Sequence, residues 1–79
     1  MKLIADISIQ SADLSALQRC FAAEIPSLQR ERSSVMVHTI KDTMHFAVTA
    51  EDATALRATL NTITKLLSTF QKAAENNHD

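Results

Sequence analysis

The sequence predicts an α+β fold with the element order β-α-β-β-α, in which a three-stranded antiparallel sheet carries two helices on one face. Two observations predict it: three segments alternate between apolar and polar residues, and two others place apolar residues at helical spacing. With 79 residues there is room for one domain. We place this domain at residues 1–76 and expect residues 77–79 to form a frayed tail.

The N-terminal third of the chain predicts a strand followed by a helix. One side of the strand would consist of Leu3, Ala5, Ile7 and Ile9. Ser11 is the expected N-cap of the helix, which would run to about Glu24 and be stopped by Pro26. Its apolar side would consist of Leu14, Leu17, Phe21 and Ile25. We expect residues 25–32 to be a surface connection.

Two further strands, at residues 33–40 and 44–49, are expected to form a hairpin. A loop centred on Asp42 and Thr43 would pair Ile40 with His45. The absence of glycine favours a loop wider than two residues. The helical crossover makes the first two strands parallel, so the third strand is expected between them. The predicted covered face of the hairpin consists of Val35, Val37, Thr39, Phe46 and Val48.

A single long helix is predicted from Thr49, the first residue of a capping box with Asp52, to about Asn76. Its apolar residues form a heptad seam of Leu56, Leu60, Ile63, Leu67, Phe70 and Ala74, flanked by a row of Thr59, Leu66 and Ala73. We expect this wide surface to serve both the sheet and a foreign helix. The alternative is that all of it packs on the sheet of its own chain.

Composition excludes several classes of function. Without glycine, the chain cannot build phosphate-binding loops, dinucleotide turns or the GXXG clamp of KH domains. The single cysteine, Cys20, cannot form an internal disulfide. No serine, cysteine or threonine has a base and an acid at a catalytic spacing, so we predict no catalytic residue and no cofactor. Lys2 is the only basic residue before Arg19 and Asp6 interrupts the opening hydrophobic stretch, so we expect no signal peptide and a cytoplasmic protein. The longest apolar runs are too short for a membrane span.

The second strand is the expected dimer edge, because residues 33–40 carry no charge. The predicted edge residues are Val35, Met36, Val37 and His38. His38 and His45 would lie diagonally on the helix-free face, together with Asp6. Spacing fixes no third ligand, so we predict no metal site there. Ile4, Met36 and Ile40 make the same face apolar enough to be a candidate contact.

Two short motifs resemble the Pcc family, whose members are the smallest subunits of the KEOPS tRNA-modification complex. Ala50, Asp52 and the segment 56–62 resemble the A-x-D…A-L-R-A-x-x-N-S/T pattern that opens the last helix of that family. Arg32-Ser33-Ser34-Val35 resembles the Arg-Ser that leads into its second strand. The element order and length also agree. The hairpin without glycine and the short tail depart from the family pattern.

The resemblance implies a non-catalytic scaffold that dimerises and packs its helices against the threonylcarbamoyl-transferase subunit of KEOPS. It implies that the contacts to the transferase come from Arg57, Leu60, Asn61, Thr64, Leu17 and Phe21. A contact to tRNA would be weak or occur within the complex. Three alternatives remain: a divergent paralogue of the same subunit, a stand-alone KH-like RNA-binding domain using Arg30 and Arg32, and a ligand-binding regulatory domain.

Overall fold

The computed structural model describes residues 1–76, so the predicted frayed tail lies outside the described residues. The elements in order are β1 (Leu3–Gln10), α1 (Leu14–Ala22), α2 (Ile25–Leu28), β2 (Ser33–Ile40), β3 (Thr43–Ala50) and α3 (Ala53–Asn76). The predicted α+β fold is confirmed, with α2 as an additional short helix.

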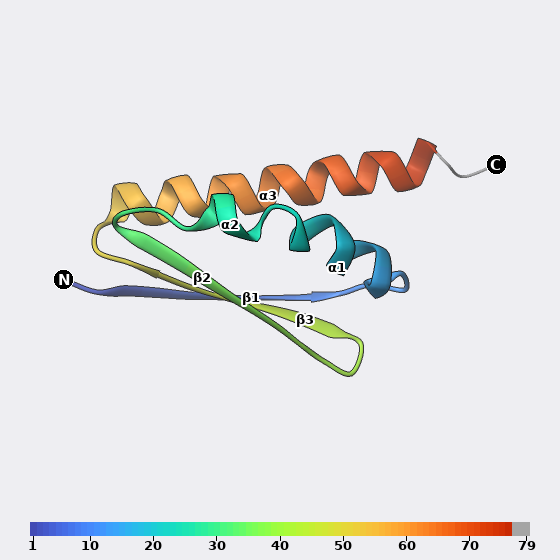
Figure 1. Cartoon of the computed structure of the whole chain (residues 1–79), viewed down its shortest axis with the longest axis horizontal. Coiled ribbons are helices and arrows are strands. Elements are labelled where there is room, and N and C mark those ends of the chain that lie inside the picture. Colours follow the sequence, from blue (N-terminus) through green and yellow to red (C-terminus); the bar gives the residue numbers. More distant parts are fainter. Residues whose placement is uncertain (77–79) are drawn as a thin grey trace.

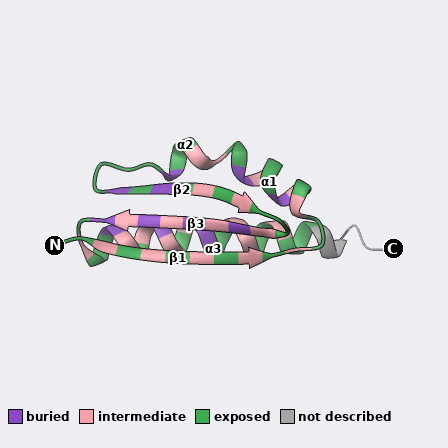
Figure 2. Ribbon diagram, turned by 90° about the horizontal axis from the view of Figure 1, so that it is seen from below, coloured by how far each residue is buried: buried purple, intermediate pink, exposed green. Residues whose placement is uncertain are grey.

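The sheet is antiparallel with the strand order β1-β3-β2, which confirms the central position of the third strand. All three helices lie on one face of this sheet, so the molecule has two layers (Figure 1). Seen from the sheet side, α3 lies behind β3 and β1, whereas α1 and α2 lie toward β2 (Figure 2). The other face carries no helix, and we call it the open face.

The core lies between the sheet and the helices, because alternate residues of each strand point toward the helices. β3 contributes Phe46 and Val48, and α3 contributes Ile63. Phe21 of α1 packs edge-on against Phe46, with ring centroids 4.8 Å apart. Every second residue of β3 is therefore fully covered, as expected for a central strand.

The predicted register of the hairpin is wrong by two residues. Ile40 pairs with Thr43 rather than His45, and the loop consists of only Lys41 and Asp42. Lys41 has a φ of 56°, so a lysine takes the left-handed conformation in which a tight turn usually places glycine. A slip of two residues keeps every side chain on its predicted face, so the predicted covered face of the hairpin is confirmed.

The N-caps of α1 and α3 both lie later in the chain than predicted. Asp13, not Ser11, caps α1, where its side chain accepts a hydrogen bond of 3.3 Å from the backbone N–H of Ala16. Asp52, not Thr49, caps α3, because Thr49 is still paired within β3. In both places an aspartate two or three residues downstream replaces the expected hydroxyl.

The prediction that residues 25–32 form only a surface connection is also wrong. This segment contains α2, which has Pro26 in its first turn, where the missing N–H costs nothing. Leu28 at its end is fully buried in the core. The buried side chain of Leu28 thus attaches this connection to the core.

Candidate partner-binding surfaces

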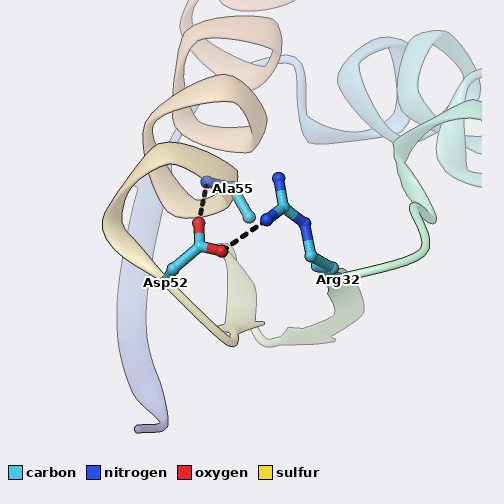
Figure 3. A network of polar contacts seen from close by, with 3 residues as sticks. All are labelled: Arg32, Asp52 and Ala55. Carbon is cyan, nitrogen blue, oxygen red and sulfur yellow. Dashed lines mark hydrogen bonds and ion pairs between the residues drawn. The ribbon is translucent and has the colours of Figure 1, made fainter.

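Polar side chains join the start of β2 to the first turn of α3. Asp52 uses both of its carboxylate oxygens there: Oδ1 accepts from the Ala55 N–H at 2.8 Å, and Oδ2 accepts from Arg32 Nη1 at 2.7 Å (Figure 3). The backbone N–H of Glu51 also donates to the Arg32 carbonyl at 3.0 Å. The side chains of Arg32 and Asp52 are 55% and 39% exposed, so solvent weakens the ion pair.

Two more contacts extend this connection along α3. The hydroxyls of Ser33 and Thr59 share a buried hydrogen bond of 2.8 Å, and Arg30 Nη2 donates to Thr62 Oγ1 at 3.3 Å. We call this region the β2–α3 joint; it consists of Arg30, Arg32, Ser33, Asp52, Thr59 and Thr62. The sequence analysis did not predict it. The two motifs behind the family resemblance are therefore in contact with each other in the fold.

The opposite side of α3 carries the residues predicted to bind a partner. Arg57, Asn61 and Thr64 are exposed on it, and we call these three residues the outer side of α3. Among residues 1–73, whose side chains the structure describes, the one ion pair joins Arg32 to Asp52, so Arg57 has no carboxylate partner there. Thr64 Oγ1 donates to the Asn61 carbonyl at 3.0 Å. The guanidinium of Arg57 and the side-chain amide of Asn61 are thus accessible for directional hydrogen bonds to another molecule.

The other three predicted transferase contacts differ in their accessibility. Leu60 is half-buried and packs against the core, so part of its side chain borders the outer side of α3. Leu17 and Phe21 of α1 are 1% and 0% exposed. Neither of these two side chains offers surface to a partner in this conformation.

Most of the heptad seam faces the sheet of its own chain. Ile63 and the flanking Thr59 are fully buried. The remaining apolar residues of both rows are partly buried against the core: Leu56, Leu60, Leu66, Leu67 and Phe70. Ala73 is exposed, and Ala74 lies outside the residues whose side chains are described. Two-sided use of this helix stays a prediction.

The seam remains open toward solvent at its C-terminal half. A hollow of about 350 Å³ lies between the end of β1, α1 and α3. It is lined by Ile9, Gln10, Ser11, Leu17, Leu67, Phe70 and Gln71. An apolar side chain from another protein would find partly exposed hydrophobic surface there.

The edge of β2 is partly occupied by a side chain of the same protein. Gln29 Nε2 donates to the Val35 carbonyl at 2.9 Å, and Gln29 Oε1 accepts from the Val35 N–H at 3.2 Å. The amide thus pairs with the outward backbone groups of Val35 as a neighbouring strand would. Backbone groups alternate in direction along a strand, so those of Val37 and Thr39 point outward as well. These two residues form the remaining free edge.

The side chains of the predicted dimer edge fall on both faces of the sheet. Val35 is buried and Val37 is half-buried on the covered face, whereas Met36 and His38 are exposed on the open face. Ile4, Met36 and Ile40, which are 65%, 73% and 55% exposed, all lie on the open face. Apart from Met1, they are the exposed large hydrophobic residues of the described part of the chain.

The arginines proposed for RNA contact lie beside a shallow hollow of about 440 Å³ near the N-terminus. Lys2, Arg30 and Arg32 contribute positive charge to its lining, but Glu31 and Glu51 oppose it. Arg30 and Arg32 also belong to the β2–α3 joint. In the described residues no helix is both long and apolar enough to cross a membrane.

Comparison with known proteins adds one match. A family model described as "transcription factor Pcc1" matches residues 3–75, which is nearly the whole chain. A search of curated proteins and a search of solved structures found no match.

Proposed function

The chain belongs to the Pcc1 family, and from this premise we propose that it is a non-catalytic, dimerising scaffold subunit of the cytoplasmic KEOPS complex. In this role it supports the formation of threonylcarbamoyl-adenosine in tRNA without contributing a catalytic residue or cofactor. The family match over residues 3–75 carries the proposal. A divergent paralogue of the same subunit would have the same fold and the same contacts.

The outer side of α3, bordered by Leu60, is the proposed contact with the transferase subunit. Arg57 and Asn61 are four residues apart and therefore share one side of the helix. A planar guanidinium and an amide without partners in the described chain suit carboxylates or helix ends on the transferase. The partly buried Leu60 adds an apolar contact next to them.

The edge of β2 is the proposed contact with a second copy. Pairing would use the outward backbone groups of Val37 and Thr39, because Gln29 already occupies those of Val35. The side chains of Met36 and His38 would lie next to this strand pairing, on the open face. Strand pairing of this kind extends an antiparallel sheet from one copy into the next.

Co-expression with the transferase subunit tests both contacts in one experiment. Replacing Arg57 and Leu60 by Glu should abolish co-purification while the dimer mass by light scattering and the circular dichroism spectrum stay unchanged. Replacing Val37 by Pro removes an outward N–H and should give monomers. The control Val37→Thr keeps the N–H and should remain a dimer. Co-purification that survives the double replacement would refute the α3 contact, and a dimer that survives Val37→Pro would refute the edge.

The runner-up function is RNA binding by the isolated chain, which Lys2, Arg30 and Arg32 around one hollow favour. Tight binding of tRNA to the purified protein, with an affinity that falls steeply as salt rises, would support this function. Weak binding with a shallow salt dependence is the result expected for the scaffold.

A further inference from the structure

Two histidines face each other on the open face. His38 of β2 and His45 of β3 are direct cross-strand partners, although the predicted register placed them diagonally. Their rings are stacked, with centroids 5.1 Å apart and planes 17° from parallel. We propose that His38 and His45 together bind a divalent transition-metal cation of the Cu²⁺, Ni²⁺ or Zn²⁺ class through their ring nitrogens.

The spacing of the two rings suits a shared ion. An imidazole nitrogen binds such a cation at roughly 2.0–2.1 Å, so two rings on one tetrahedral ion have centroids on the order of 5 Å apart. Because an imidazole lone pair lies in the plane of its ring, the His38 ring must turn about its Cβ–Cγ bond, out of the stacked arrangement, before one nitrogen of each ring points toward a shared ion, while His45 keeps its contact with Ser8. Because strand pairing already holds both side chains together, the second imidazole binds at a high effective concentration.

A third strand positions one of the rings. Ser8 of β1 pairs with His45, and its Oγ lies at hydrogen-bond distance, 3.1 Å, from His45 Nδ1. When Nδ1–H donates to this hydroxyl, Nε2 carries the lone pair that a metal requires. Histidine ligands in metal sites are commonly oriented by such a hydrogen bond at the other nitrogen. Ser8 is therefore a positioning residue of the proposed site.

The chemical type of the protein ligands determines which metals this site selects. Among the described residues no group of three or more His, Cys, Asp and Glu could hold an ion, so water completes the coordination. Two imidazoles without carboxylates favour Cu²⁺, Ni²⁺ and Zn²⁺ over Mg²⁺ and Ca²⁺, which prefer oxygen ligands. The sequence predicted no metal site because spacing fixed no third ligand. No third ligand lies among the described residues either, so the proposal rests on the direct pairing of the two rings alone.

Calorimetric titration of the untagged full chain with NiCl₂, and with MgCl₂ as a control, tests the site. We expect saturable binding of one Ni²⁺ and no binding of Mg²⁺. The variants His38→Gln and His45→Gln should each bind Ni²⁺ about tenfold more weakly or worse, because each loses the chelate. Ser8→Ala should bind several-fold more weakly. Unchanged circular dichroism spectra would establish that each variant is folded.

The matched control is His78→Gln, which removes the one other histidine of the chain. This variant should bind Ni²⁺ like the wild type. The proposal is overturned if His38→Gln binds as tightly as the wild type, or if binding is lost with His78. Wild-type affinity in Ser8→Ala would overturn the positioning role of Ser8. The site uses one chain only and is independent of the transferase. Because His38 also lies on the proposed dimer edge, the mass of each variant by light scattering separates a loss of metal binding from a loss of strand pairing.

Discussion

The β2–α3 joint and the outer side of α3 lie on the same helix and use the same kinds of residue in different ways. In the joint, the hydroxyl of Thr59 is buried and paired with Ser33, and the carboxylate of Asp52 accepts two hydrogen bonds. On the outer side, Arg57 and Asn61 are exposed. One side of α3 thus has its polar groups satisfied within the chain, and the other side leaves them accessible.

This difference separates two roles within one sequence motif. Asp52 and Thr62 lie in the same short pattern as Arg57 and Asn61, yet the first two connect α3 to the segment before β2. The contacts that Asp52 and Thr62 make within the fold explain why these residue types occupy the two positions. The identity of Arg57 and Asn61 has no such explanation within the described chain, which is why they carry the proposed contact with the transferase.

The largest expected effect is on the buried centre of α3. Ile63→Ala should lower the free energy of unfolding by about 2–5 kcal/mol, because it leaves a cavity in a fully covered part of the core. Urea denaturation followed by circular dichroism measures this loss. The matched outer-side variant Arg57→Ala should change the free energy of unfolding by less than about 0.5 kcal/mol. A comparable loss of unfolding free energy in both variants would show that the outer side of α3 contributes to the stability of the fold as much as its buried side does.

The buried hydrogen bond of the joint gives the next effect. Thr59→Val keeps the shape of the side chain but leaves the Ser33 hydroxyl without its partner, at a cost of about 1–3 kcal/mol in unfolding free energy. Adding Ser33→Ala should restore most of that loss, since no unpaired hydroxyl remains. A double-mutant cycle in urea measures the coupling. Additive losses would show that the two hydroxyls act independently.

The surface contacts of the joint give the smallest effect. Asp52→Ala removes the N-cap of α3 and should cost about 1 kcal/mol in unfolding free energy, whereas Arg32→Ala should cost only about 0–1 kcal/mol. Thermal melts at low and high salt separate the two contributions, because salt weakens the exposed ion pair more than the short hydrogen bond of the N-cap. Because Asp52→Ala removes both contacts, an equally large loss in Arg32→Ala would show that the ion pair, not the cap, holds the start of α3.

Local sequence patterns predicted most of the architecture. The alternation in residues 33–40 matches the bounds of β2, and the apolar side of α3 is centred on Ile63, a residue of the predicted seam. The central position of β3 followed from the helical crossover between the first two strands. The exposure of Arg57 and Asn61 on one side of the helix also followed from their spacing.

Contacts between distant residues could not be predicted in this way. The pairs Ser33–Thr59 and Arg32–Asp52 join residues 26 and 20 positions apart, and no periodicity reports such proximity. The pairing of Gln29 with the edge of β2 has the same character, because a polar residue in a connection has many available partners. Leu28 was missed because one apolar residue in a polar segment gives no period.

The sequence by itself determined the three strands, the two longer helices, the face of each strand that is covered, and the family, since all of these depend on the local order of residue types. The tertiary structure alone decided the hairpin register and the direct pairing of His38 with His45. A slip of two residues leaves the burial of every side chain unchanged, so hydrophobic patterning cannot choose between the registers. The two-residue loop at Lys41 and Asp42 makes that choice, and with it determines which side chains meet on the open face.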